Sequence, residues 1–157
     1  MSSSESFRDA MSRYPTGVTV VTAYHDGKAY GITANSFASV SLEPPLVLWS
    51  VVKAAERANV FLAAKSYAIC FLGKEQADIA KFCAENECLP DGKWSENRYG
   101  FPVIDGAGAV LACRQHAVYP GGDHDIIVGE VMGISVNEGA GALTFHRSQY
   151  GQLDQGE

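Results

Sequence analysis

The sequence is short of positive charge and of long hydrophobic runs. It carries 12 lysine and arginine residues against 18 aspartate and glutamate residues, which gives a formal net charge of -6 and a pI near 5.2. This acidic balance argues against a nucleic-acid partner and against a polybasic membrane patch. No apolar run approaches the ~20 residues of a membrane span. The first residues show no basic segment followed by an apolar one, so we expect a cytoplasmic protein without an export signal.

Cysteine is also scarce, and its spacing excludes a metal-binding pattern. Of the four cysteines, Cys83 and Cys88 are separated by four residues, and no histidine pair lies nearby to complete a zinc site. Cys70 and Cys113 stand in apolar runs, which is typical of small buried side chains. A disulfide framework is not expected in a cytoplasmic protein. We therefore expect no metal site and no cross-links.

What the chain does contain is the composition of an ordinary globular protein. Hydrophobic residues make up 46% and charged residues 19% of its 157 residues, which excludes a disordered chain. This length allows a substantial core, and we see no linker or internal repeat. The sequence therefore predicts a single domain over residues 1–157.

Strand patterns outnumber helical ones. β-Branched and alternating residues predict strands over 16–24, 29–32, 46–51, 67–72, 109–118, 126–136 and 143–150, with turns at 25–28 and 120–123. Apolar residues at helical spacing predict helices over 4–14, capped by Ser4, and over 53–64 and 75–84. The polar stretch 86–99 is predicted to be a long loop. Because a sheet closed on itself has no exposed edges, we expect a mainly β fold, one closed or split barrel with peripheral helices.

One stretch stands out between two apolar strands: Thr33-Ala34-Asn35-Ser36-Phe37-Ala38-Ser39-Val40-Ser41. We call this stretch the rim. Its small residues let a backbone approach a flat ligand, while hydroxyls and free N–H groups can satisfy that ligand's polar edge. A Ser-rich strand crossing satisfied by its own backbone explains the same residues. On pattern alone, both interpretations stay open.

Several collinear segments together resemble a known family. They are Phe7-Arg8-Asp9-Ala10-Met11, Pro15-Thr16-Gly17-Val18-Thr19-Val20-Val21-Thr22, the rim with Leu42-Glu43-Pro44-Pro45-Leu46, Gly122-Asp123-His124, Gly129-Glu130-Val131, and Phe145-His146-Arg147 with Tyr150. In this order they resemble the flavin reductase-like proteins with the FMN-binding split barrel, and in particular the reductase partners of two-component flavin monooxygenases. The resemblance covers about residues 7–150.

The resemblance implies an activity, cofactors and partners. It implies an NAD(P)H-dependent flavin reductase that transfers a hydride from NADH or NADPH to FMN or FAD. It also implies a homodimer with flavin near the subunit interface, and a separate monooxygenase that receives the reduced flavin by diffusion. Cofactors carry this chemistry, which agrees with a sequence that offers no obvious nucleophile or metal site.

The resemblance also implies roles for particular residues. Those expected to hold the flavin ring are Thr33, Ala34, Asn35, Ser36, Ser39, Val40 and Ser41. His124 is expected beside the nicotinamide, where a neutral imidazole can orient the cofactor. Arg147 and Tyr150 match positions that close over the dinucleotide, through an ion pair and stacking. Each also has an ordinary structural explanation. His124 is then a solvated turn residue, and Arg147 and Tyr150 belong to a C-terminal surface segment.

A flavin phosphate needs a cation and N–H donors. Ser50 and Val51 end a predicted strand just before the predicted helix 53–64, and helix N-termini attract anions. Lys53 and Arg57 add positive charge there, so these four residues are the candidate phosphate site. Solvated helix charges explain Lys53 and Arg57 as well. Relatives often carry Ser or Thr at the start of this helix, where this chain has alanines at 54, 55 and 58, so FMN and FAD both stay open.

Two other functions are compatible with a flavin-binding split barrel: a flavin carrier and an oxidase. A non-catalytic flavin carrier would use the same barrel, since fold does not settle function, but it has no need of a nicotinamide site at His124 and Arg147. An oxidase acting on a phosphorylated pyridoxine compound would need clustered basic residues, and the 12 lysines and arginines are not grouped.

Overall fold

A computed structural model describes residues 2–154, and strands form most of its ordered structure. The elements, in chain order, are α1 (Ser3–Ser12), β1 (Thr16–Gly17), β2 (Thr19–His25), β3 (Lys28–Ala34), β4 (Ala38–Ser41), β5 (Leu46–Val52), α2 (Ala58–Ala63), β6 (Ser66–Phe71), α3 (Ala77–Glu85), β7 (Trp94–Glu96), β8 (Pro102–Ile104), β9 (Ala109–Gly121), β10 (His124–Val136), β11 (Ala142–His146) and β12 (Gln149–Leu153). The prediction of a mainly β protein with peripheral helices is confirmed.

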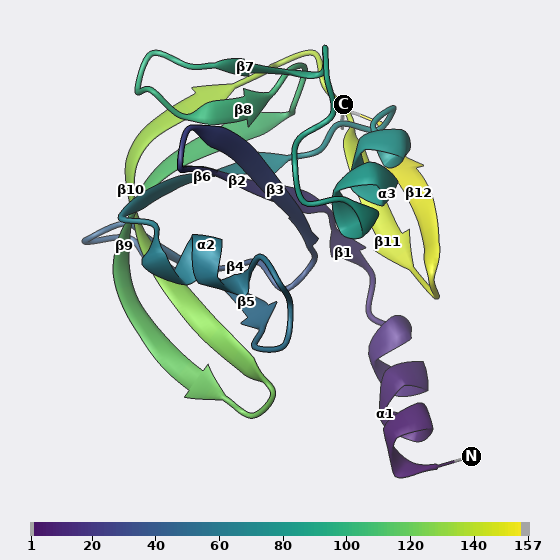
Figure 1. Ribbon diagram of the computed structural model, residues 1–157. Helices are drawn as coiled ribbons and strands as arrows, with labels where there is room; N and C mark the ends of the chain where they lie inside the picture. The colour runs from purple at the N-terminus through teal and green to yellow at the C-terminus, as the bar shows by residue number, and fades with distance from the viewer. Residues whose placement is uncertain (1, 155–157) are drawn as a thin grey trace.

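The main sheet has seven antiparallel strands in the order β3-β2-β6-β9-β10-β5-β4. β3, at one end of this order, also contacts β5 near the other end, so the sheet is bent round on itself (Figure 1). A smaller sheet, β1-β11-β12, and the β7–β8 pair lie outside it. The bend encloses the first of two apolar clusters, in which Trp49 meets Phe61 edge-on with ring centroids 5.4 Å apart.

The second apolar cluster joins the main sheet to α3 and β11. It includes Val20, Ile79, Cys83 and Leu143, all buried. Cys70 and Cys113 are buried as predicted, and burial raises the pKa of the Cys113 thiol to about 12. These thiols are therefore neutral packing residues at physiological pH.

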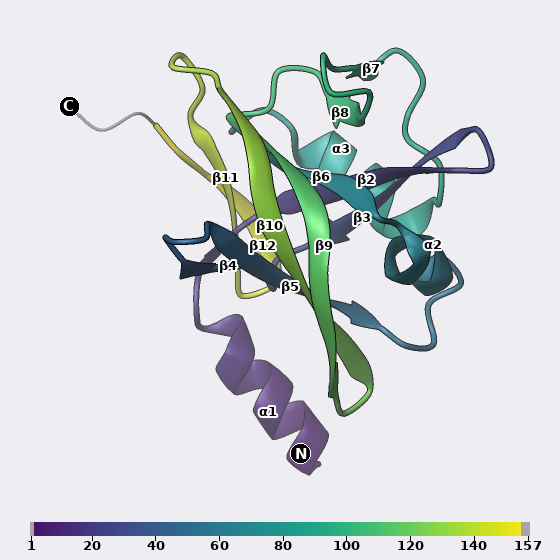
Figure 2. The same cartoon turned by 90° about the vertical axis from the view of Figure 1, so that its left-hand side faces the viewer.

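The first helix differs from its prediction in its cap and its environment. Ser2, not Ser4, is the N-cap: its side chain accepts from the backbone N–H of Glu5, whose carboxylate accepts from the Ser2 N–H. The apolar residues Phe7 and Met11 do recur at helical spacing, but α1 has no buried residue. Figures 1 and 2 show α1 extending away from both sheets. Its apolar side is therefore uncovered within the chain.

The predicted helix 53–64 is wrong in its first half, because α2 begins only at Ala58. The Lys53 N–H donates to the Asp123 carbonyl at 2.9 Å, which continues the β5–β10 pairing one residue further. This long-range hydrogen bond holds Lys53 at the sheet, and turns fill the interval up to α2. Only Val60 and Phe61 at the centre of α2 pack as the helical pattern predicted.

The predicted loop 86–99 is also partly wrong. Trp94–Glu96 forms β7 against β8, and Cys88 makes an isolated bridge with Tyr30 of β3. Both partners are distant in sequence, so the local composition did not indicate them. The last predicted strand, 143–150, is likewise two strands, β11 and β12, joined by a turn at Arg147 and Ser148.

None of the helices in the described part of the chain has the length and apolar character needed to cross a bilayer.

Candidate functional site

The rim runs from the end of β3 to the end of β4, and two of its hydroxyls are already engaged by the protein. Thr33 Oγ1 donates to the Ala80 carbonyl of α3 at 2.7 Å. Ser36 Oγ accepts from the Ser50 N–H at 2.9 Å and lies 3.3 Å from the Ser50 carbonyl oxygen. Ser36 thus extends the β4–β5 pairing beyond Ala38 with its side chain. The hydroxyls of Thr33 and Ser36 shape the rim, and the Ala34 carbonyl is engaged as well, because it accepts from Thr19 Oγ1 at 2.7 Å.

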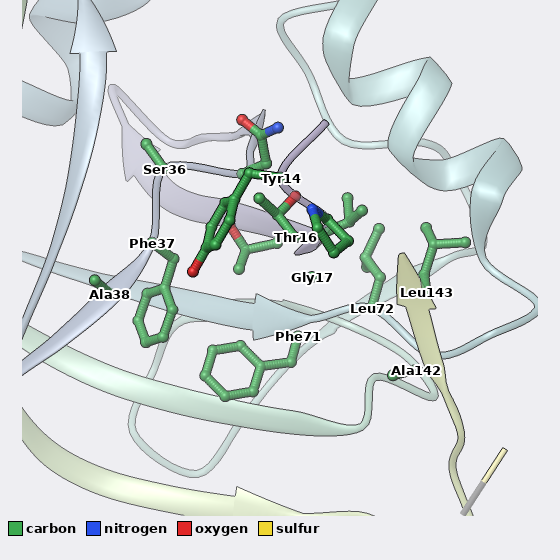
Figure 3. Close-up of a pocket in the computed structure, with 14 residues that line it drawn as sticks. Tyr14, Thr16, Gly17, Ser36, Phe37, Ala38, Phe71, Leu72, Ala142 and Leu143 are labelled. Carbon is green, nitrogen blue, oxygen red and sulfur yellow. The ribbon is translucent and has the colours of Figure 1, made fainter. Parts of the chain in front are cut away.

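A cavity of about 630 Å³ opens beside the rim (Figure 3). It is lined by Tyr14, Pro15, Thr16, Gly17, Val18, Thr19, Asn35, Ser36, Phe37, Ala38, Phe71, Leu72, Ala142 and Leu143. The rings of Phe37 and Phe71 meet edge-on on one side of it, with centroids 4.9 Å apart. This volume falls within the range of small-molecule and cofactor pockets, and the lining combines apolar surface with a few polar groups, as such pockets do.

Sequence reasoning did not name Thr16, Phe71 and Leu143 as site residues. Thr16 lies in one of the segments that carry the family resemblance, and that segment was the only sequence signal for it. Phe71 and Leu143 were predicted only as strand residues. Within residues 2–154, Thr16 Oγ1 is buried and has no hydrogen-bond partner. An unsatisfied buried hydroxyl is costly, and this one lies in the wall of the cavity.

Asn35 lies where three cavities meet. Besides the large cavity, it lines one of about 150 Å³ with Thr33, Ala84 and Tyr150. It also lines one of about 310 Å³ between α1 and the β11–β12 turn, together with Ser148. The structure therefore brings the predicted rim and the predicted dinucleotide residue Tyr150 to one place. Ser39, Val40 and Ser41, further along β4, line none of these three cavities.

A second group of predicted residues lies along the neighbouring strands. Val52 of β5 pairs with His124 of β10, and Ser50 pairs with Ile126. Ser50 is also the residue that Ser36 holds, so this strip adjoins the rim. The side chain of Val51 faces the other way and is only 1% exposed, and Val51 pairs with Asp125 of β10.

His124 stands beside two carboxylates at the β9–β10 turn. Its Nδ1 lies 2.7 Å from Asp123 Oδ1, and this hydrogen bond holds the pKa of Asp123 below its ordinary value. The Lys53 ammonium lies 3.9 Å from Asp125 Oδ1, a loose ion pair. With Nδ1 fixed by Asp123, the His124 Nε2 is the ring atom left to face a ligand. Lys53 lies near this turn because its N–H pairs with the Asp123 carbonyl. No helix begins at Lys53, since α2 starts at Ala58.

Arg57 does not fit the phosphate role predicted for it. Its guanidinium donates to the carbonyl oxygens of Gly31, Cys83, Ala84 and Asn86. Burial lowers the pKa of Arg57 from its ordinary value. Four backbone acceptors already engage this side chain, so it is committed to the interior of the fold.

The β11–β12 turn holds the remaining predicted residues. Arg147 and Ser148 both have positive φ, 51° and 62°, in a two-residue turn without glycine. The Arg147 N–H donates to the Ser12 carbonyl at 2.7 Å, which ties the turn to the end of α1. The Tyr150 ring packs on Phe145 with centroids 5.1 Å apart, and the Lys81 ammonium lies 5.8 Å from its centre. Non-glycine residues held at positive φ store strain, which is concentrated at functional sites.

A metal-dependent site has no support in this geometry. Among residues 2–154, no group of three or more histidine, cysteine, aspartate or glutamate side chains is placed to hold a metal ion.

Comparisons with known proteins agree on one family. Residues 11–154 match the model of the flavin reductase like domain. The chain is 42% identical over 153 residues to an FMN reductase (NADH) of Agrobacterium fabrum, covering 97% of this chain and 87% of that protein. It is 36% identical to the reductase component of 4-hydroxyphenylacetate 3-monooxygenase of Thermus thermophilus, covering 95% and 96% of the two chains. Among solved structures, an NADH:FAD oxidoreductase of Streptomyces globisporus, in complex with NAD and FAD fragments, superposes with a TM-score of 0.90 at 34% identity, covering 96% and 93%.

Proposed function

The chain belongs to the flavin reductase like family, and from that premise we infer that it is an NAD(P)H-dependent flavin reductase. It transfers a hydride from a reduced nicotinamide to FMN or FAD and so supplies reduced flavin to a monooxygenase. The observation that carries this conclusion is the family match over residues 11–154, which spans the rim, the cavity beside it and the His124 turn in one collinear alignment.

The residues present fit a flavin. The cavity is of cofactor size, and Asn35 and Ser36 of the rim line it. The Thr16 hydroxyl in the cavity wall is a further polar group, buried and without a hydrogen-bond partner among residues 2–154. When bound, flavin supplies the ring that accepts a hydride and later releases the electrons. The protein has only to orient two cofactors, which agrees with the burial of the Cys70, Cys83 and Cys113 thiols.

We assign the rim, and Asn35 in particular, to the flavin ring. We assign Ser50 and Lys53 to the flavin phosphate. Lys53 is about half exposed and only loosely paired, so its charge is available to an anion. His124, fixed through Nδ1 by Asp123, orients the nicotinamide through Nε2. Arg147 and Tyr150 close over the dinucleotide, since Tyr150 shares a cavity with Asn35 and Arg147 occupies the turn next to it.

We further propose that the chain is one domain whose curved sheet closes as a split barrel, and that two copies form a homodimer. The apolar residues left uncovered on α1, just after it and on β10 support the dimer. Phe7 and Met11 of α1 and the following Tyr14 are 64%, 54% and 74% exposed, and Met132, Ile134 and Val136 of β10 are more than half exposed as well. Such surfaces mark association sites. Light scattering of the purified protein gives the mass that tests this.

We propose an oxygenase as the recipient of the reduced flavin. The support is that several relatives are named reductase components of flavin-dependent monooxygenases. One structural relative is the reductase component of a tryptophan halogenase, so the partner's chemistry varies within the family. Transfer by diffusion predicts that oxygenase activity persists when a dialysis membrane separates the two proteins.

The decisive experiment is steady-state oxidation of NADH and of NADPH with FMN, FAD and riboflavin in turn. We expect turnover with at least one pair and a clear preference for one nicotinamide. Tight flavin binding without any oxidation of either nicotinamide would refute the reductase and favour a flavin carrier.

A further inference from the structure

The side chain of Arg57 connects the segment between β5 and α2 to β3 and to the end of α3 through hydrogen bonds. Its backbone follows β5 and leads into α2, while its guanidinium reaches across β3 to the end of α3. Nη1 lies 2.7 Å from the carbonyl oxygens of Gly31 and Cys83 and 2.5 Å from that of Asn86. Nη2 lies 3.2 Å from the carbonyl oxygen of Ala84.

Three of these acceptors belong to the C-terminal end of α3, where a helix leaves its last carbonyls unsatisfied. The Phe82 carbonyl accepts from Asn86, through both its backbone N–H and its side-chain amide. Arg57 satisfies Cys83 and Ala84, and its positive charge suits the negative end of the helix dipole. The fourth acceptor, Gly31, lies in β3. Arg57 therefore fixes the end of α3 against β3.

The end of α3 is also a wall of the candidate site. Ala84 lines the 150 Å³ cavity together with Phe145 and Tyr150. A shift of this helix end changes the gap between Ala84 and Tyr150. The rim has its own anchors, the bonds from Thr33 to Ala80 in the first half of α3 and from Ser36 to Ser50. Neither of those bonds involves the Arg57 side chain.

We propose that Arg57 is a positioning residue for nicotinamide binding: it holds the α3 wall, at Ala84, at the width that seats the dinucleotide against Tyr150. The inference rests on the proposed function, because that function places the dinucleotide at Tyr150. It replaces the direct contact with the flavin phosphate that the sequence suggested.

The two roles of Arg57 predict different kinetics, so substitutions separate them. In Arg57→Met the wall loses its hydrogen bonds, and we expect KM for the preferred nicotinamide to rise about tenfold, with kcat and the flavin KM within about twofold of the parent. The ratio of FMN to riboflavin efficiency is expected to stay unchanged. In Arg57→Lys the defect is expected to persist, because an ammonium group cannot reproduce a planar fork that binds carbonyls in several directions.

The matched control is Arg114→Met, which removes an equally long cation whose only partner in the described chain is Glu130 on the surface. It is expected to leave both KM values unchanged. A second variant, Ala84→Leu, narrows the same cavity without touching Arg57. It is expected to raise the nicotinamide KM alone, and it keeps the test open if Arg57 variants do not fold.

Three results would overturn the inference. A fall in the FMN to riboflavin ratio in Arg57→Met, restored by lysine, would return Arg57 to the phosphate. A lower melting temperature with both KM values unchanged would leave it a purely structural role. An unaffected nicotinamide KM in Ala84→Leu would remove the wall from the site. Failure of the parent protein to oxidise NADH or NADPH would instead refute the proposed function itself.

Discussion

The bond between Ser36 and Ser50 makes a prediction that separates a structural hydroxyl from a ligand-binding one. In Ser36→Ala, the Ser50 N–H loses its acceptor and the Ser50 carbonyl loses its donor. One hydrogen bond contributes about 1 kcal/mol net, and this pair is partly exposed, so we expect a loss of about 1 kcal/mol. For a chain of 157 residues this lowers the melting temperature by ~2–4 °C.

The same substitution is expected to weaken flavin binding indirectly. When the bound conformation of the rim loses about 1 kcal/mol of stability, the rim samples other conformations, and flavin affinity falls by up to about fivefold. Thermal unfolding without flavin and titration of flavin fluorescence measure the two effects. Ser66→Ala is the matched control, because Ser66 is exposed at the start of β6, lies outside the rim and forms no side-chain hydrogen bond with residues 2–154. A normal melting temperature combined with weaker flavin binding would refute the reasoning, because the Ser36 hydroxyl would then contact flavin directly.

Three further predictions concern stability. A Cβ added at Gly31 would lie 2.3 Å from Cδ2 of the buried Leu89, so Gly31→Ala is expected to cost about 1–3 kcal/mol in chemical unfolding. Ser148→Gly relieves a positive φ and is expected to stabilise by about 0.5 kcal/mol, seen as a small rise in melting temperature. The hydrogen bond from Lys74 holds the pKa of Asp154 below its ordinary 3.8. That contribution is present above pH 3.8 and is lost as pH falls through the lowered value, so melting curves of Asp154→Asn and the parent should converge in strong acid.

Each of these has a contrary outcome. Gly139→Ala, in a turn where the nearest atom to the added Cβ lies 3.8 Å away, is the control for Gly31, and equal losses of stability at both sites would show that contact with Leu89 is not responsible. A lower melting temperature for Ser148→Gly would mean that its side chain stabilises the turn. A constant difference between Asp154→Asn and the parent across the acid range would remove Lys74 as the cause.

Local pattern predicted those elements whose residues decide their own conformation. The β-branched run that begins at Thr19 is a strand, and the apolar spacing at Ile79 and Cys83 does mark a helix. The errors arose where a distant partner decides the structure. Lys53 stays with the sheet because Asp123 accepts its N–H, and Trp94 enters a strand because β8 lies beside it. No spacing along the chain shows those partners.

The same distinction holds for the candidate site. The small residues at 33–36 indicated a ligand-facing segment, and the structure sets Thr33, Asn35 and Ser36 beside a cavity, whereas Ala34 is buried in the core. The bonds of Arg57 to carbonyls from β3 and α3 had no signal in sequence, because backbone acceptors are present at every position. Gly129, part of the family resemblance, has a packing reason: a Cβ there would meet the Tyr67 hydroxyl at 2.2 Å. Some residues of the family motifs are therefore explained by packing in the interior and not by contact with a ligand.

The position of Asn35 at the junction of three cavities sets a limit on redesign. An enzyme engineer who enlarges or charges this side chain to change the flavin preference will also alter the space next to Tyr150 and the space below α1. Under the proposed assignment of Asn35 to the flavin ring, a substitution chosen for one cofactor also changes the space for the other. Leu143 and Ser148 each border a single one of these cavities and can be varied independently.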